Sequence, residues 1–236
     1  MPAGERKSYR LAELDDYGGL PRSRYRHAAP WTLRLRARLS APDLPGTWGF
    51  GLWNDPFGLN LGLGGKPGRL PALPQAAWFM HASLPNWLSF RDAPLPGSDR
   101  VVPANGFHAG TFRSPKLPSL LLAPALLALP LFELPPTSRL LRRLAGRMIR
   151  QDGAAIGTDV TEWHEYAIAW LDKGCFFTVD GKETLVTPTA PQPPLGLVIW
   201  IDNQFAAWTP EGRLGYGTLE NPSAWMEIEK LSIQQE

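Results

Sequence analysis

A nine-residue segment that alternates strictly between apolar and polar side chains constrains the fold of this chain more than any other feature. In WTLRLRARL, residues 31–39, every second residue is apolar, and one threonine and three arginines lie between them. Successive side chains of a β-strand point to opposite faces, so this period of two predicts a strand with one buried and one solvated face. The chain therefore needs a second layer that covers the apolar face of this segment.

The segment TEWHEYAIAWLDKGCFFTVDGKE, residues 161–183, predicts an antiparallel hairpin. Two apolar, aromatic-rich runs flank an Asp-Lys-Gly turn, and an Asp-Gly turn follows directly. Short turns of this kind join neighbouring antiparallel strands. Residues 1–30 are polar and predict a surface wrap or an edge strand. Further strands are predicted within residues 47–55, 76–83, 194–205 and 225–235.

Length and composition favour a single all-β domain covering residues 1–236. The chain has 236 residues, and its 25 prolines and 23 glycines suit many short strands joined by turns. A formal net charge of +2 argues against nucleic acid as a partner. The single cysteine, Cys175, excludes an intrachain disulfide and a cysteine-based metal site. The N-terminus has no apolar core typical of a secretory signal, so we expect a cytoplasmic protein.

Residues 113–157 interrupt the strand pattern and predict a helical insertion in the sandwich. The stretch LPSLLLAPALLALPLFELPP is almost wholly apolar, but its prolines argue against one continuous membrane-spanning helix. The next stretch, TSRLLRRLAGRMIRQ, has helical periodicity, with leucines on one stripe and arginines mostly opposite. It predicts a short basic amphipathic helix.

Three interpretations of this insertion remain open. It forms a lid over the sandwich that creates an apolar pocket, or it lies in a membrane interface, or it is a helical hairpin packed on the sandwich. In the lid and membrane interpretations the basic residues that matter are Arg139, Arg142, Arg143 and Arg147, because arginines can contact anionic head groups while leucines point inward.

Three segments in the same order resemble glycoside hydrolase family 16, the laminarinase-like enzymes of the concanavalin A-like superfamily. The strand motif H-x-Y-a-x-x-W followed by f-x-V-D-G matches the chain from His164 to Gly181. LPGTWGFGLWND, residues 44–55, resembles the family's early glycine-rich turn and Trp-ending strand, and the segment from Met226 to Gln235 resembles its closing strand. The resemblance covers roughly residues 31–82 and 158–236.

This resemblance implies a jelly-roll β-sandwich whose concave face binds a glycan. The family carries its two catalytic carboxyl groups on one strand, in a pattern like Glu-x-Asp-x-x-Glu. The corresponding stretch here, QAAWFMHAS, contains no aspartate and no glutamate. A retaining glycosidase needs a nucleophile and an acid/base, so the loss of both argues against the family's chemistry.

His81 is the only titratable residue in that stretch, so it is a candidate general base or ligand donor. The alternative is a histidine that is hydrogen-bonded within the sandwich. The polar run Asp202, Asn203 and Gln204 interrupts an apolar strand between Trp200 and Trp208. Such side chains can bind sugar hydroxyls while tryptophan stacks on sugar faces, although the same run also fits a simple turn.

The remaining candidates are weaker. Trp53, Asn54 and Asp55 end a strand and could form the rim of a cleft, although Asn-Asp-Pro also starts turns. Trp78 and Trp87 are candidate ligand platforms or core residues. Glu229 occupies the place of an acid that helps to hold a structural calcium in the family, but no second ligand is identified and no other metal site is expected.

Three functions follow from these residues, and whether the chain is an enzyme stays open. The first is a family 16-like jelly roll without the acid pair, which binds a glycan or a lipophilic small molecule on its concave face. The second is a glycoside hydrolase with displaced acids, built from Asp202, Asp55 and His81. The third is a peripheral membrane protein attached through the insertion.

Overall fold

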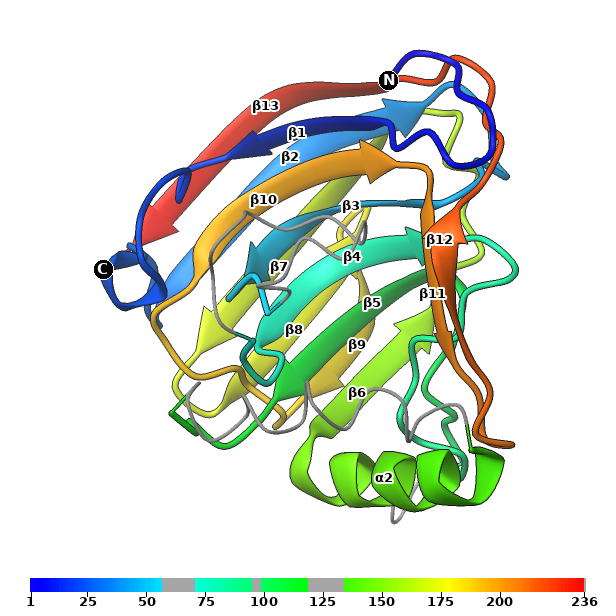
Figure 1. Cartoon of the computed structure of the whole chain (residues 1–236). Helices are drawn as coiled ribbons and strands as arrows, with labels where there is room; N and C mark the ends of the chain where they lie inside the picture. The colour runs from blue at the N-terminus through cyan, green and yellow to red at the C-terminus, as the bar shows by residue number, and fades with distance from the viewer. Residues whose placement is uncertain (57–70, 95–98, 119–133, 236) are drawn as a thin grey trace.

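The computed structural model describes residues 1–56, 71–94, 99–118 and 134–235. Two antiparallel sheets lie face to face (Figure 1). The six-stranded sheet contains, in spatial order, β1 (Leu11–Asp15), β10 (Gly196–Asp202), β3 (Thr47–Trp53), β4 (Ala76–Ala82), β5 (Gly106–Arg113) and β6 (Arg150–Ala155). The five-stranded sheet contains β13 (Met226–Gln235), β2 (Trp31–Leu39), β7 (His164–Leu171), β8 (Gly174–Val179) and β9 (Lys182–Thr187).

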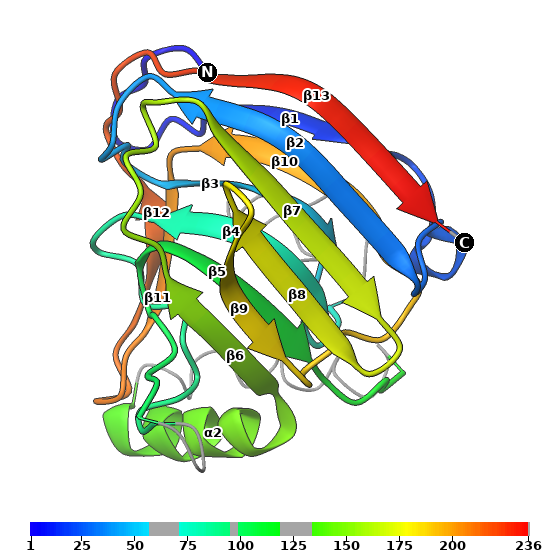
Figure 2. The same ribbon diagram turned by 180° about the vertical axis from the view of Figure 1, so that it is seen from behind.

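Three smaller elements lie outside these sheets. A hairpin of β11 (Gln204–Trp208) and β12 (Leu214–Thr218) crosses the ends of the central strands, and helix α2 (Pro135–Met148) lies beside β6 at one end of the molecule (Figures 1 and 2). A short 3₁₀ turn, η1, spans Arg22–Arg24. This arrangement confirms the predicted all-β jelly-roll β-sandwich with a helical insertion.

The main core lies between the two sheets, as the alternation in β2 predicts. The five apolar residues of β2 are buried, and they pack with inward-facing residues of the six-stranded sheet such as Phe50 and Phe79. The edges of the aromatic rings meet at this interface, with the Phe79 and Phe177 ring centroids 5.4 Å apart at 88°. Burial of apolar area between the sheets is the main favourable contribution to the fold.

A second apolar cluster covers the opposite face of the six-stranded sheet, which we call the outer face. It contains Tyr17, Tyr25, Ala76, Trp78, Met80, Ala82, Phe112, Ile149, Val198 and Trp200. A Cβ atom at Gly49 would lie 2.7 Å from Cη2 of Trp200 and 2.4 Å from the carbonyl oxygen of Phe79. Only glycine fits at position 49, so the space that the glycines of β3 leave is filled by the ring of Trp200.

The predicted turns and strands agree with the structure in most places. Asp180 and Gly181 both have positive φ, 51° and 73°, as a tight Asp-Gly hairpin turn requires. The polar N-terminal segment supplies the edge strand β1. The insertion is narrower than residues 113–157, because Arg150–Ala155 forms β6 and Gly106–Arg113 forms β5, both paired in the six-stranded sheet. Its apolar stretch at 119–133 lies outside the described residues.

Candidate functional site

The outer face of the six-stranded sheet is where the family 16 resemblance would place a ligand, because β4 is the strand that corresponds to the acid motif. Register alone decides which side chains reach this face. The three central strands, β3, β4 and β5, each contribute four residues to this face. They are Thr47, Gly49, Gly51 and Trp53 of β3, Ala76, Trp78, Met80 and Ala82 of β4, and Gly106, His108, Gly110 and Phe112 of β5. None of these residues is acidic, so β3, β4 and β5 present no carboxyl group on this face, whereas Asp202 of β10, which pairs with Thr47, also faces this side.

Three tryptophans meet on this face. The ring of Trp200 lies parallel to that of Trp53, with centroids 6.3 Å apart and planes at 5°. The ring of Trp78 lies 6.2 Å from that of Trp53 and 5.6 Å from that of Trp200, tilted against both. Trp78 and Trp200 are 8% and 9% exposed, while Trp53 is partly exposed. The structure thus brings together three of the tryptophans that the sequence analysis considered as ligand platforms.

Side chains from outside the sheet cover these tryptophans. Tyr17 and Tyr25 come from the segment after β1, and the Tyr17 hydroxyl accepts a 2.7 Å hydrogen bond from Nε1 of Trp53. Phe90 packs on the opposite side, and its ring lies 6.5 Å from that of Phe112 at 87°. Burial raises the pKa of the Tyr17 hydroxyl, which therefore stays protonated. The face is a covered apolar surface rather than an open groove.

One polar niche lies within this apolar face, above Gly110. Nε1 of Trp78 is buried and has no hydrogen-bond partner among the residues that the structure describes. Nδ1 of His108 lies 3.0 Å from the carbonyl oxygen of Gly106, which makes Nδ1 the protonated nitrogen and leaves Nε2 as an acceptor. A Cβ atom at Gly110 would lie 3.6 Å from Trp78 Nε1 and 3.7 Å from His108 Nε2. Burial lowers the pKa of His108, so the ring is neutral. The niche offers one donor and one acceptor.

His81 lies on the opposite face of β4 from this niche. Its register partners are Trp48 and Phe107, both members of the core between the sheets. The side chain is buried, and burial lowers its pKa to about 4. His81 therefore does not share a face with Trp78 or Trp200, and it is neutral at physiological pH.

The polar run at the end of β10 forms a buried turn. Oδ1 of Asp202 accepts hydrogen bonds from the Thr47 hydroxyl at 2.9 Å and from two backbone N–H groups, those of Thr47 and Gln204. Burial raises the pKa of Asp202 to about 7. Asn203 joins three segments, because it accepts a hydrogen bond from the N–H of Arg10 and donates to the carbonyl oxygens of Ser8 and Leu219. These contacts hold the N-terminal segment against the sandwich.

Asp55 and Asp202 lie at opposite ends of β3. Asp202 pairs with Thr47, the first residue of β3, and Asp55 follows Trp53, its last residue. Six steps of about 3.3 Å put these two ends about 20 Å apart. Glycosidase carboxyl groups lie about 5–10 Å apart, so Asp55 and Asp202 do not form a catalytic pair. Asn54 is also structural: it donates to the carbonyl oxygen of Leu73 at 2.8 Å and accepts from the N–H of Gln75.

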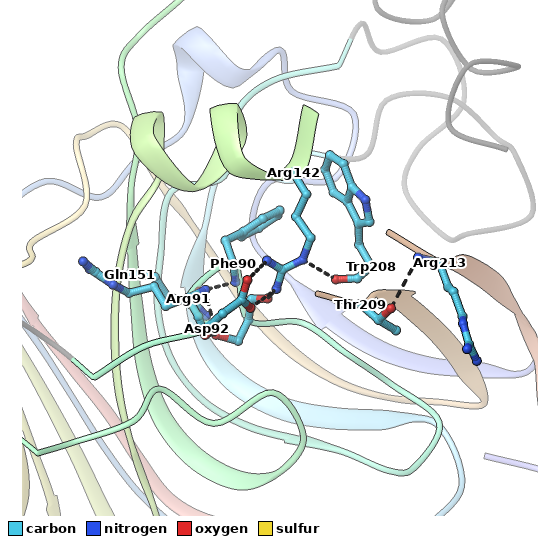
Figure 3. A network of polar contacts seen from close by, with 9 residues as sticks. Phe90, Arg91, Asp92, Arg142, Gln151, Trp208, Thr209 and Arg213 are labelled. Carbon is cyan, nitrogen blue, oxygen red and sulfur yellow. Dashed lines mark hydrogen bonds and ion pairs between the residues drawn. The ribbon is translucent and has the colours of Figure 1, made fainter. Parts of the chain in front are cut away.

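The remaining aromatic candidates, Trp87 and Trp208, belong to the contact between the β11–β12 hairpin and its neighbours. Trp208 donates its N–H to the backbone carbonyl of Trp87, and its Nε1 donates to the Ser138 hydroxyl of α2 at 2.9 Å. Its carbonyl oxygen accepts a 2.7 Å hydrogen bond from Nε of Arg142 (Figure 3). Neither tryptophan belongs to the outer-face cluster, although the ring of Trp208 lies 6.0 Å from that of Phe90, which packs on the cluster.

Of the four arginines singled out in the insertion, Arg142 differs from the others. Its side chain is 2% exposed and also binds the carboxylate of Asp92 at 2.8 Å and the carbonyl oxygen of Ser89 at 2.6 Å. Arg139, Arg143 and Arg147 are exposed. Arg142 thus anchors α2 to the body of the protein, whereas the other three face solvent.

The described residues contain neither a cluster of metal-ligating side chains nor a membrane-spanning helix. Glu229 forms an ion pair with Arg36 at 3.1 Å. Within the described ranges, no group of three or more His, Cys, Asp or Glu side chains is arranged to hold a metal ion. None of the helices described there is long and apolar enough to cross a membrane.

Two shallow hollows lie away from the outer face. One of about 420 Å³ is lined by residues near both chain ends, including Glu5, Arg10 and Glu220. The other, of about 230 Å³, lies beside Arg113, Trp170 and Pro193. Neither is lined by the tryptophans of the outer face.

The fold and this face define a jelly-roll β-sandwich in which β3, β4 and β5 contain no aspartate and no glutamate. No family model and no curated protein matches the chain. Similar solved structures include a legume lectin-like domain from Entamoeba histolytica, with 11% identity, TM-score 0.46, and coverage of 100% of this chain and 82% of that one. A glycoside hydrolase family 16 endo-glucanase from Bacteroides ovatus has 9% identity, TM-score 0.42, and coverage of 94% and 74%.

A glycoside hydrolase family protein from Mycobacterium thermorestibile is similar over 89% of this chain, with 14% identity and a TM-score of 0.40. The chain spans 65% of the length of that protein. At these identities the similarity concerns the fold alone, and the jelly-roll assignment rests on the strand order and register of the chain itself.

Sequence reasoning missed His108, Gly110 and Tyr17. His108 has no spacing typical of a metal ligand, so no local motif marks it in the sequence. Its position opposite Met80 and next to Trp78 follows from the pairing of β4 with β5, a contact between segments about 30 residues apart. GFHAGTFR, residues 106–113, shows no strict alternation because β5 is buried on both faces, so the local sequence gives no clear strand signal.

Proposed function

We propose that this chain is a non-hydrolytic binding protein that holds a largely apolar small molecule on the outer face of its six-stranded sheet. The observation that carries this proposal is the set of outward-facing residues of β4. Ala76, Trp78 and Met80 stand on the strand that resembles the acid-bearing strand of family 16. These side chains offer apolar contact and no acid–base chemistry.

The chemistry of the face favours a lipophilic ligand over a glycan. A sugar has a hydroxyl group on most of its carbons, and each one needs a partner when it is buried. The central part of the face offers mainly Nε1 of Trp78 as donor and Nε2 of His108 as acceptor. That pair suits a single hydroxyl group, which accepts one hydrogen bond and donates another. We therefore infer an apolar alcohol, for example an isoprenoid alcohol, whose hydroxyl lies above Gly110.

Entry of such a ligand requires movement of covering side chains. Trp53 is the partly exposed member of the tryptophan cluster, and Leu20 and Phe90, which pack on the cluster, are also only partly buried. A ligand that displaces these side chains exchanges one apolar contact for another. The cost of opening is therefore small compared with that of removing a deeply buried core residue.

Gel filtration with radiolabelled farnesol tests this proposal, in parallel with labelled laminarihexaose. We expect farnesol to co-elute with the protein and laminarihexaose not to. Trp53→Ala is expected to weaken farnesol retention at least tenfold. The matched control is Trp225→Ala, because Trp225 is an exposed tryptophan beside the five-stranded sheet. Retention of laminarihexaose alone, or equal loss in both variants, would contradict the proposal.

Hydrolysis with displaced acids is a second candidate because of Asp202. Its pKa of about 7 would keep it partly protonated near neutral pH, as a general acid requires. Glu13 pairs with Trp200 in the β1–β10 register and is therefore a diagonal neighbour of Asp202 on the same face, about 7–8 Å away. Release of reducing ends from laminarin by the wild type, lost in Asp202→Asn, would favour this candidate.

A further inference from the structure

Helix α2 docks on the protein through its polar side. Ser138 and Arg142 are its buried residues, and both form hydrogen bonds to the body of the protein. Figure 3 shows the contacts of Arg142. Gly146 lies on the same side, where a Cβ atom would be 2.9 Å from the carbonyl oxygen of Phe90. Polar contacts, a close backbone approach and the packing of Ala145 on the outer apolar cluster together account for the orientation of the helix.

The apolar stripe of α2 is left exposed by this orientation. Leu140, Leu144 and Met148 are 56%, 44% and 40% exposed. They follow one another at intervals of four residues, so they lie in one row along the helix. An amphipathic helix of a globular protein usually turns such a row towards the core. Here the row faces solvent over most of the length of the helix.

A row of arginines runs beside the apolar row. Arg139, Arg143 and Arg147 are also spaced by four residues, and each precedes one member of the apolar row. One residue corresponds to about 100° around the helix, so the two rows are neighbours on the exposed side. Residues 135–148 contain no acidic side chain. The carboxylate of Asp92 pairs with the buried Arg142 and not with these three arginines.

We propose that this side of α2 binds the surface of an anionic lipid bilayer, with Leu140, Leu144 and Met148 inserted at the interface and Arg139, Arg143 and Arg147 at the lipid head groups. A row of apolar side chains beside a row of positive charges is the pattern of interfacial helices. The helix lies at one end of the molecule in both views, so the sandwich does not obstruct its approach to a flat surface (Figures 1 and 2).

Charge argues against a second copy of the chain as the occupant. Two copies of α2 packed through their apolar rows would bring arginine rows of the same sign close together, which is unfavourable without intervening acids. Three exposed side chains also provide far less area than the roughly 800 Å² per partner of a stable protein interface. A bilayer supplies negative charge and an apolar interior together, and it needs no matching shape.

The test is flotation of the full chain with vesicles of phosphatidylcholine alone, or with 30% phosphatidylglycerol. We expect the wild type to float only with the anionic vesicles. Since each arginine near an anionic surface contributes about fivefold in binding, Arg139→Gln/Arg143→Gln/Arg147→Gln is expected to reduce binding about 100-fold. Leu140→Ser/Leu144→Ser/Met148→Ser is expected to reduce it at least tenfold. All six positions are exposed, so both variants should keep the melting temperature of the wild type.

The matched control is Arg24→Gln/Arg26→Gln/Arg34→Gln, which removes the same charge from exposed positions outside α2. It is expected to bind anionic vesicles within twofold of the wild type. Equal loss in the control and the α2 charge variant would overturn the proposal, because binding would then depend on net charge alone. Absence of flotation by the wild type would also overturn it, as would a wild-type dimer that becomes monomeric when the apolar row is replaced.

Discussion

The imidazole ring of His81 lies almost parallel to the indole ring of Trp48, with centroids 5.4 Å apart and planes at 10°. Trp48 belongs to the core between the sheets, so this contact places His81 on the core side of β4. Nδ1 of His81 is buried and has no hydrogen-bond partner, which favours the neutral ring. The contact is structural, and it has a measurable consequence for stability.

His81 is expected to make the fold less stable in mild acid. Its pKa is about 4 in the folded state, below its ordinary value of 6.5. Between pH 6.5 and 4 the unfolded chain gains a proton that the folded chain does not, so the free energy of unfolding falls as the pH falls, by roughly 3 kcal/mol. Urea denaturation of wild type and His81→Phe at pH 7.5 and 4.5 should show a smaller loss in the variant. His108 remains in both proteins, so an equal loss in both would contradict this assignment.

Asp202 is expected to act in the opposite direction. Its pKa is raised from 3.8 to about 7, so the folded chain keeps a proton that the unfolded chain releases as the pH rises through this range. Stability therefore falls with increasing pH, by about 4 kcal/mol. Asp202→Asn keeps the acceptor for Thr47 and Gln204 and cannot ionise. Its thermal melting temperature should exceed that of the wild type at pH 8 and match it at pH 4; a lower value at pH 8 would rule out this explanation.

Arg142 is expected to be the arginine of α2 on which stability depends. Arg142→Met leaves the carbonyl oxygens of Ser89 and Trp208 and the carboxylate of Asp92 without their donor. We expect a loss of about 2–4 kcal/mol in the free energy of unfolding. Arg143→Met, at the neighbouring exposed position, is the matched control and should change it by less than about 0.5 kcal/mol. Equal effects in chemical denaturation would mean that α2 is not held by Arg142.

Cys175 is expected to be unreactive in the folded protein. Its side chain is fully buried in β8, and burial raises the pKa of its thiol to about 12. The thiolate is the reactive form, so labelling by a disulfide reagent at pH 8 should be limited by unfolding. The labelling rate is expected to rise with urea concentration in parallel with the unfolded fraction. Rapid stoichiometric labelling without urea would show that β8 opens locally.

Much of the fold can be predicted from segments in which one face of a strand is buried and the other is solvated. The alternation in residues 31–39 predicts β2, and the Asp-Gly pair at 180–181 predicts the turn between β8 and β9. In both cases the local sequence favours the same backbone conformation that the surrounding structure requires. A period of two and a turn that needs positive φ are visible without knowledge of any partner strand.

The side-chain faces of β4 could not be predicted in the same way. Every residue of AAWFMHA is buried, because the core covers one face of the strand and the outer apolar cluster covers the other. A strand buried on both faces shows no alternation, so nothing local distinguishes the face of Trp78 from the face of His81. The separation of Asp55 from Asp202 likewise depends on the register of β3 with β10.

Helix α2 shows a different limit of sequence reasoning. Its periodicity predicts a helix with an apolar and a basic side, and the structure contains that helix. Periodicity does not say which side docks. That choice depends on Ser89 and Asp92 of one segment and on Trp208 of β11, which together provide partners for Arg142.

The fit of Trp200 over Gly49 makes position 200 depend on glycine at 49 during sequence divergence. The indole of Trp200 and the backbone carbonyl oxygen of Phe79 both exclude a side chain at 49, so a smaller residue at 200 would remove only one of these two clashes. In chains descended from the same ancestor, glycine at 49 should accordingly persist even where residue 200 varies. A lineage that had lost the large ring would have a different surface chemistry there, and with it a different repertoire of bound molecules.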